Sequence, residues 1–278
     1  MAVKEQKLRV DGHIHSEYSH DSTCAVSEIY QTAREKGMDV VCITDHCDLY
    51  PAHETREVLD YRVQVFRGIK ETVKDYRDVE ILIGVELGGG FIRPELAQQV
   101  IDSQPYDVII GSVHGIMFRG ERTSTSKLDF GSIDEESMLE YLDGYLDASI
   151  YIAEKLDVDV LAHLTYIFRY INGKYGKNLS WRVQEDKIRR VLRALIQREI
   201  ALEINTSCVG SFYDEWLPSK EVLDLYIQMG GRLITLGSDA HKSEKIGNGF
   251  EVVKDYLRQK GIDTLVYYKQ RKPQFYKI

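Results

Sequence analysis

Residues 8–15 read LRVDGHIH, a short apolar run that ends in two histidines two positions apart. Six further short apolar runs follow along the chain, and most of them also end in histidine, aspartate or glutamate. They are DVVCITDH (39–46), EILIGVE (80–86), YDVIIGSVH (106–114), DVDVLAH (157–163), IALEINTS (200–207) and RLITLGSDAH (232–241). Runs that are short and apolar nearly throughout are typical of parallel strands covered on both faces. The sequence therefore predicts seven such strands.

Longer amphipathic stretches separate these runs and predict helices. They cover residues 27–36, 54–76, 94–103, 134–156, 181–199, 219–229 and 243–260. Seven β-then-α units in series indicate a closed barrel or a doubly wound sheet. The length of 278 residues suits one α/β barrel, and no Pro/Gly/Ser-rich linker divides the chain. We therefore expect a single domain over 1–278, with the barrel at about 8–260 and an extended closing segment at 261–278.

The composition of the chain indicates which kinds of partner to expect. The net charge of −8 argues against a broad nucleic-acid-binding surface but leaves room for a small anionic substrate. The polar N-terminus MAVKEQKLRV lacks the apolar stretch of a signal peptide, and no apolar run approaches the roughly 20 residues of a membrane helix. The four cysteines show no C-x-x-C spacing, which favours free thiols in a reducing compartment. We expect a cytoplasmic protein without membrane or nucleic-acid partners.

The residues that could bind metal lie at the ends of the predicted strands. The metal-competent residues there are His13, His15, Asp45, His46, Glu86, His114, His163, Asp239 and His241. In α/β barrels the C-terminal strand ends form the active site, so these side chains should converge. One H-x-H or one buried histidine is weak evidence, but six of the eight histidines fall at strand ends. Imidazole and carboxylate without thiolate suit zinc, iron or manganese, and so many ligands fit two or three divalent ions.

These residues also form motifs that resemble a known family. HIHSEYSHD (13–21), TDH (44–46), GVE (84–86), GSVH (111–114), AH (162–163) and GSDAH (237–241) are similar, in order, to motifs of the polymerase and histidinol phosphatase (PHP) superfamily. The resemblance covers about residues 8–245, and YYKQRKPQFY (267–276) is similar to the C-terminus of histidinol phosphatases. It implies a distorted (β/α)7 TIM-like barrel with a cluster of two to three metal ions.

The same resemblance implies a set of ligands. The first metal would take His13, His15, Glu86 and Asp239; the second would share Glu86 and add His114 and His163; the third would take Asp21, His46 and His241. His20 is an alternative to Asp21, and we prefer Asp21 on its position in the motif. Asp239, His241 and Glu86 are the catalytic candidates, and Asp239 would both bind metal and orient the nucleophile.

The implied activity is hydrolysis of a phosphomonoester by a hydroxide that bridges two cations. Arg169 is the first candidate to bind the phosphate, followed by Arg119 and Arg122. The leading substrate is L-histidinol phosphate, which would be hydrolysed to L-histidinol and phosphate in histidine biosynthesis. Glu203 or Asn205, which alternate on the sixth strand, would then bind the substrate amine.

Three alternatives stay open at this point. Other PHP phosphoesterases act on protein phosphotyrosine, nucleotides or other small phosphomonoesters. An amidohydrolase shares the barrel and the H-x-H motif, but many use a carboxylated lysine on the fourth strand, where this chain has His114. A metal-binding accessory or proofreading-type module is the alternative outside enzymes, and the full ligand set argues against it.

Overall fold

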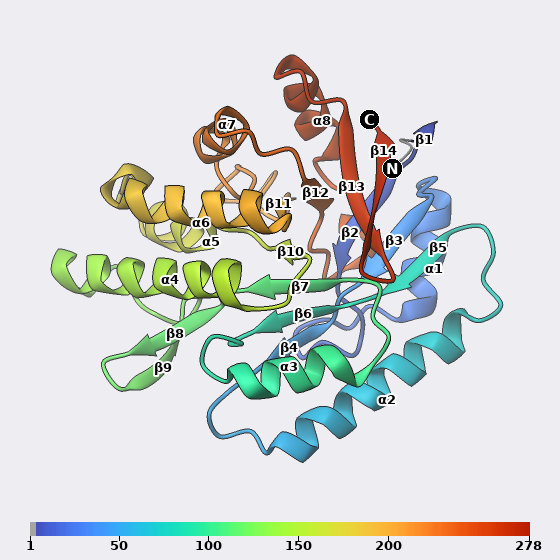
Figure 1. Ribbon diagram of the computed structural model, residues 1–278, viewed down its shortest axis with the longest axis horizontal. Helices are drawn as coiled ribbons and strands as arrows, with labels where there is room; N and C mark the ends of the chain where they lie inside the picture. Colours follow the sequence, from blue (N-terminus) through green and yellow to red (C-terminus); the bar gives the residue numbers. More distant parts are fainter. Residues whose placement is uncertain (1–3) are drawn as a thin grey trace.

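Seven parallel strands form a nearly closed barrel in the computed structural model, which describes residues 4–278 (Figure 1). Two of the seven are interrupted, so each appears as a pair of short strands: β3 (Val40–Ile43) with β4 (His46–Asp48), and β5 (Glu80–Ile83) with β6 (Val85–Gly88). β2 (Val10–Ile14), β3 and β5 form one sheet, and β4 and β6 belong to a second sheet. That sheet goes on through β7 (Ile109–Ser112), β10 (Val160–Leu161), β11 (Ala201–Asn205) and β12 (Ile234–Gly237).

The barrel closes where β12 returns to β2. The backbone N–H of Asp239 donates to the His13 carbonyl at 2.8 Å, and the N–H of His15 donates to the Ala240 carbonyl at 2.9 Å. Closure therefore brings the first and the last histidine motif together. The prediction of a distorted (β/α)7 barrel is confirmed, and the doubly wound alternative is wrong.

The interruption between β5 and β6 depends on Gly84. A Cβ at this position would lie 2.5 Å from Val108 Cγ1 and 2.6 Å from the Val108 carbonyl oxygen. Only glycine lets the broken strand approach its neighbour so closely. After the break the chain enters β6 and carries Glu86 to the inside of the barrel mouth, where it is 1% exposed.

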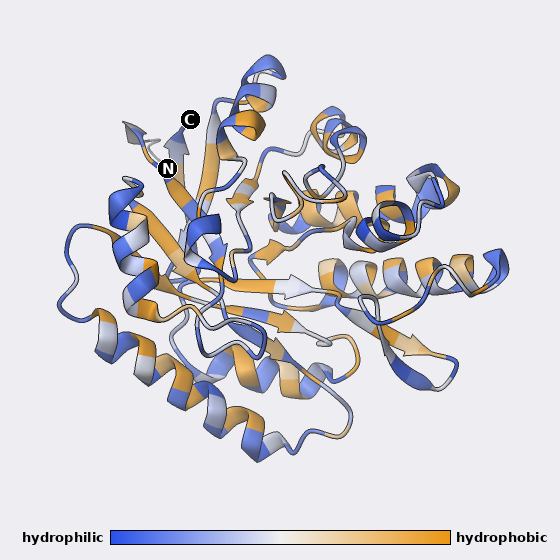
Figure 2. Cartoon of the chain, turned by 180° about the vertical axis from the view of Figure 1, so that it is seen from behind, coloured by the Kyte–Doolittle hydropathy of each residue, from blue (hydrophilic) through white to orange (hydrophobic). Residues whose placement is uncertain are grey.

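Helices cover the outside of the strands (Figure 1). In α1, Val26, Ile29, Tyr30 and Ala33 are buried at the i, i+3, i+4, i+7 spacing of an amphipathic helix. Figure 2 shows apolar strands inside and helices with mixed faces around them. The helices are α1 (Val26–Glu35), α2 (Thr55–Val73), α3 (Pro94–Ser103), α4 (Glu135–Lys155), α5 (Tyr166–Phe168), α6 (Glu185–Arg198), α7 (Lys220–Gln228) and α8 (Phe250–Gln259), with the shorter turns η2 (Trp181–Gln184) and η3 (Ser243–Lys245).

The structure departs from the expected elements, or adds to them, in four places. The stretch 243–260 is not one helix, because Gly247 and Gly249 have positive φ and separate η3 from α8. A hairpin of β8 (Gly115–Phe118) and β9 (Glu121–Ser124) projects beyond β7, and a π-helix, η1 (Arg169–Lys174), follows α5. The closing segment is a hairpin of β13 (Thr264–Lys269) and β14 (Lys272–Lys277) that pairs with β1 (Lys4–Lys7) outside the barrel.

Among the described residues, no helix is both long enough and apolar enough to cross a membrane. The four cysteines are buried and free, as the sequence predicts.

Candidate metal centre

The metal-competent residues converge at the C-terminal mouth of the barrel. His13, His15 and Glu86 lie on its floor and are at most 1% exposed. His163 and Asp239 follow β10 and β12 with φ of 28° and 52°, in the left-handed region that L-residues rarely adopt. Strained backbone of this kind clusters at functional sites, and here it turns both side chains toward the mouth.

A first group of donor atoms comes from four side chains. His13 Nε2 lies 3.0 Å from His15 Nε2 and 3.6 Å from Glu86 Oε2. His15 Nε2 lies 3.1 Å from Asp239 Oδ1. Ligand atoms bound tetrahedrally to one zinc ion are about 3.4 Å apart. The spacing of these four donors therefore fits a single four-coordinate cation.

A second group gathers around the other oxygen of Glu86. His163 Nε2 lies 2.9 Å and His114 Nε2 3.1 Å from Glu86 Oε1. The oxygen of Glu86 that faces the first group, Oε2, lies 2.7 Å from His46 Nδ1, yet both atoms are buried without a hydrogen-bond partner among the described residues. Buried polar atoms rarely stay unsatisfied, and a cation between them would satisfy both. The donor set and these orphaned atoms thus fit bound metal.

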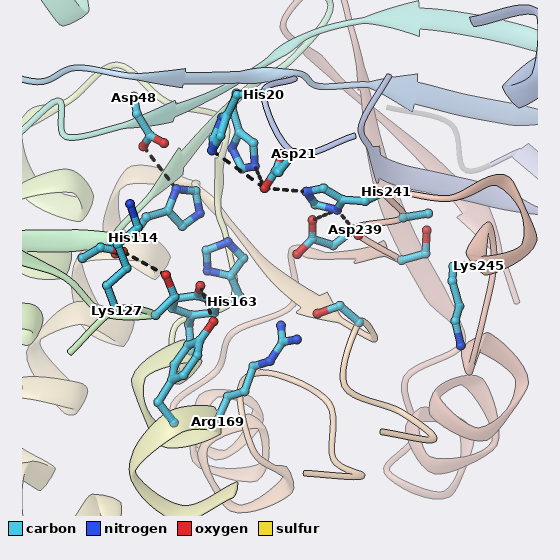
Figure 3. A pocket seen from close by; sticks show the side chains of 18 of the residues that line it. His20, Asp21, Asp48, His114, Lys127, His163, Arg169, Asp239, His241 and Lys245 are labelled. Carbon is cyan, nitrogen blue, oxygen red and sulfur yellow. Dashed lines mark hydrogen bonds and ion pairs between the residues drawn. The ribbon is translucent and has the colours of Figure 1, made fainter. Parts of the chain in front are cut away.

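A third group lies nearer the solvent. Asp21 Oδ2 is 3.5 Å from His46 Nε2 and 3.3 Å from His241 Nε2. His20, the alternative in the motif, is 68% exposed, and its Nε2 lies 4.0 Å from the Asp21 carboxylate. Asp21 therefore lies between His46 and His241, and Figure 3 shows its carboxylate beside His241. His15, His46 and His241 also bring one ring nitrogen each within 4.8 Å of one another.

The electrostatics of the cluster favour bound positive charge. Burial alone would lower the pKa of His13, but Glu203, Asp239 and Glu86 raise it well above its usual value. Burial and the nearby His46 lower the pKa of His15 to about 3. Burial alone would raise the pKa of Glu86, but the surrounding histidines hold it well below its usual range. The carboxylates thus stay ionised, and protons or cations must balance them.

A pocket of about 710 Å³ opens above these groups. Six of the nine ligand candidates line it: Asp21, His46, His114, His163, Asp239 and His241. Arg169, at the first position of the π-helix, points into the pocket (Figure 3), and its buried Nε has no hydrogen-bond partner in the part of the chain that the structure describes. Arg122 also lines it, with its guanidinium 3.7 Å from the centre of the Tyr50 ring and its Nε likewise without a partner among residues 4–278. Two of the three candidate arginines therefore reach the pocket with free donors.

The third candidate arginine, Arg119, does not reach the pocket. Arg119 sits in the turn between β8 and β9, and its guanidinium donates to the Glu140 carboxylate and to the Ser137 hydroxyl. It is 57% exposed and does not line the pocket. The expectation that Arg119 binds phosphate is wrong, because the hairpin turns this side chain toward α4.

Neither Glu203 nor Asn205 faces the pocket, so neither meets the expectation of binding a substrate amine. Glu203 is 0% exposed, and its Oε1 lies 2.6 Å from His13 Nδ1. Asn205 donates from Nδ2 to Glu203 Oε2 at 3.1 Å and to Asp239 Oδ2 at 3.2 Å. Both side chains lie beneath the candidate ligands.

Sequence reasoning missed two further groups at the site. Asp48 Oδ1 lies 3.2 Å from His114 Nδ1 and lines the pocket. The Ser19 hydroxyl lies 3.0 Å from His15 Nδ1 and donates to Asp45 Oδ1 at 2.7 Å. Asp48 could have been found from its spacing, because residues two apart on a strand share a face and His46 is two positions before it.

Comparisons with known proteins agree with the fold and with the family that the motifs resemble. A family model described as "PHP domain" matches residues 11–207. A probable histidinol-phosphatase of Clostridium acetobutylicum is 30% identical over 87% of this chain and 89% of the relative. A histidinol-phosphatase of Lactococcus lactis is 29% identical over 92% of this chain and 93% of the relative.

Solved structures of related proteins have the same fold. A crystal structure of histidinol phosphate phosphatase from Lactococcus lactis, complexed with zinc, L-histidinol and phosphate, superposes with a TM-score of 0.75. It is 26% identical in sequence and covers 96% of this chain and 98% of its own. A putative histidinol phosphatase from Listeria monocytogenes, 20% identical, shares the fold with a TM-score of 0.71 over 88% of this chain and 99% of its own.

Proposed function

The chain belongs to the PHP domain family, and on that premise we propose that it hydrolyses L-histidinol phosphate to L-histidinol and phosphate, a step of histidine biosynthesis. The observation that carries the proposal is the convergence of histidine and carboxylate donors around Glu86, beneath a pocket that Arg169 enters. The chain is a phosphomonoester hydrolase by this family membership. The named substrate comes from its similarity to histidinol phosphatases over nearly its whole length.

The site suits divalent metal ions, and we propose two or three of them, as zinc, iron or manganese. The nine residues that would hold them are His13, His15, Asp21, His46, Glu86, His114, His163, Asp239 and His241. When bound, divalent cations supply positive charge for the phosphate oxygens and lower the pKa of water toward neutrality. Glu86 presents one oxygen to each side of the cluster, so it would be shared between ions.

The protein's own groups would bind and orient the substrate. Arg169 and Arg122 present free guanidinium donors, which match the non-bridging oxygens of a phosphate in geometry and charge. Burial alone would raise the pKa of Asp239, but His13 and its neighbours hold it well below its usual value. The Asp239 carboxylate, steadied by Asn205 at 3.2 Å, is therefore ionised and can orient the attacking water by accepting its hydrogen bond. His241 lies beside it at the pocket wall.

The direct test is a steady-state comparison of L-histidinol phosphate with phosphotyrosine and nucleotide monophosphates, on protein reconstituted with zinc, iron or manganese. We expect kcat/KM for L-histidinol phosphate to exceed the others by at least tenfold. A smaller preference would remove this substrate from the proposal while leaving the phosphatase activity.

One observation favours a second candidate among phosphomonoesters. The pocket is lined by Lys127, Lys242 and Lys245 in addition to the two arginines, whereas its acidic residues, Asp21, Asp48 and Asp239, all lie within 4.0 Å of a histidine. A basic rim attracts substrates with further negative charge, such as nucleotides or phosphorylated peptides. The same steady-state comparison tests this second candidate. If it is right, nucleotides or phosphorylated peptides should have a higher kcat/KM than L-histidinol phosphate.

A further inference from the structure

Two carboxylates lie beside candidate metal ligands, and neither belongs to the ligand set: Glu203 is fully buried, and Asp48 is 9% exposed and lines the pocket. We infer that Glu203 and Asp48 are positioning residues, each of which orients one histidine so that its Nε2 faces the metal cluster. Glu203 would hold His13, and Asp48 would hold His114. The inference rests on the proposed metal-dependent function and deepens it.

Glu203 is the better buried of the two. Its Oε1 lies 2.6 Å from His13 Nδ1, while Oε2 accepts the backbone N–H of His163 at 3.0 Å and the Asn205 amide at 3.1 Å. A carboxylate that receives hydrogen bonds in this way leaves the proton of the imidazole on Nδ1. The lone pair of His13 then lies on Nε2, the atom 3.0 Å from His15 Nε2 and within the first donor group.

Asp48 repeats the arrangement on the other side of Glu86. Its Oδ1 lies 3.2 Å from His114 Nδ1, and His114 Nε2 lies 3.1 Å from Glu86 Oε1. Metal-binding histidines usually donate their second N–H to a carboxylate, a carbonyl or water, which fixes the tautomer and increases the basicity of the ligand. The two pairs come from different strands, β11 and β4, yet present the same nitrogen to the cluster.

A glycine makes room for each pair. A Cβ at Gly237 would lie 2.5 Å from Glu203 Oε1 and 2.6 Å from His13 Cβ. A Cβ at Gly88 would overlap Asp48 Oδ1 and lie 3.4 Å from His114 Nδ1. Gly88 is the direct partner of Asp48 in the β4–β6 register, and Gly237 lies on β12 beside β11. Side chains at these positions would displace the carboxylates, so the backbone is shaped around both contacts.

A purely structural role makes a different prediction. Asp159 is a suitable control, since it is also a buried carboxylate, 8% exposed, but it accepts the N–H of Ile109 at the opposite end of the strands. Its replacement changes stability without touching the cluster. If Glu203 and Asp48 only supported folding, their variants would behave like Asp159→Asn.

The experiment measures zinc affinity by competition with a chromogenic chelator, in wild type, Glu203→Ala, Asp48→Asn and Asp159→Asn. The unfolding free energy of each metal-free protein is measured in parallel. We expect zinc to bind about 10- to 100-fold more weakly to Glu203→Ala and Asp48→Asn, the usual cost of removing such a partner, and unchanged in Asp159→Asn. Activity of the two site variants should recover toward wild type as zinc is raised. If Glu203→Ala does not fold, Glu203→Gln keeps the volume and carries the test.

Two results would overturn the inference. Zinc affinity within threefold of wild type in both site variants would reduce the two carboxylates to structural groups and leave the proposed function standing. A wild-type protein that binds no zinc, iron or manganese would remove the metal-dependent function together with the inference.

Discussion

Replacing Arg169 with alanine should lower kcat/KM for L-histidinol phosphate by roughly 10- to 150-fold. Arg169 is the first residue of the π-helix and its side chain points into the pocket (Figure 3), where its buried Nε has no partner among the residues described. It makes cation–π contacts with the rings of Tyr170 and Phe212, at 5.9 and 5.7 Å from the centroids. The guanidinium is thus held in place with its donors free for an anion.

The size of the effect follows from the type of bond that is lost. A hydrogen bond to a charged group contributes about 1.5–3 kcal/mol, and about 1.4 kcal/mol corresponds to a factor of ten. Arg169→Lys keeps the charge but loses the forked geometry, so it should recover only part of the activity. Product inhibition by inorganic phosphate should weaken in parallel, because the phosphate group itself loses the contact.

The assay is steady-state release of phosphate with metal-saturated enzyme, and Arg119→Ala is the matched control. Arg119 is paired with Glu140 outside the pocket, so its loss should leave kcat/KM within twofold of wild type. Activity of Arg169→Ala within threefold of wild type, or an equal loss in Arg119→Ala, would refute the assignment of Arg169 to the phosphate.

Three further predictions concern the cluster and the scaffold. Asp239→Ala should abolish measurable turnover, and near-normal phosphate release would contradict its role. Removal of metal by a chelator should abolish activity and lower the melting temperature, and added zinc, iron or manganese should restore both, because ligands of the native state stabilise it. Burial raises the pKa of Asp159 to about 6, despite the opposing charge of Arg271, against an ordinary value of 3.8. The fold therefore favours the protonated acid, and as the pH rises from 4 to 7 wild type should lose about 2 kcal/mol of unfolding free energy relative to Asp159→Asn. Urea unfolding at several pH values measures this, and a difference that does not vary with pH would contradict it.

Much of the barrel could be predicted because its strands are covered on both faces. Each strand therefore reads as a short apolar run, and the polar residues that end it stand out. The residues of the H-x-H motif, His13 and His15, illustrate this, since both lie at the end of β2. The convergence of distant motifs followed from one topological rule, that parallel strands bring their C-terminal ends to one face.

Other features depend on contacts that a single sequence does not display. The β8–β9 hairpin decides that Arg122 faces the pocket and Arg119 faces α4, although the two are three residues apart. The role of Glu203 depends on the register between β11 and β12, which sets it beneath His13. The tail was expected to be an extended closing segment. Its two strands pair with each other and with β1, while the barrel closes between β12 and β2.

The positive φ angles of His163 and Asp239 have a consequence for how this chain can change over time. An L-residue held in the left-handed region costs about 1–2 kcal/mol, which glycine does not incur. A descendant released from selection for catalysis would gain stability by replacing either residue with glycine, and the same exchange would remove a donor from the cluster. At these two positions backbone strain thus accompanies the donors of the cluster, and stabilising the protein by design should begin elsewhere.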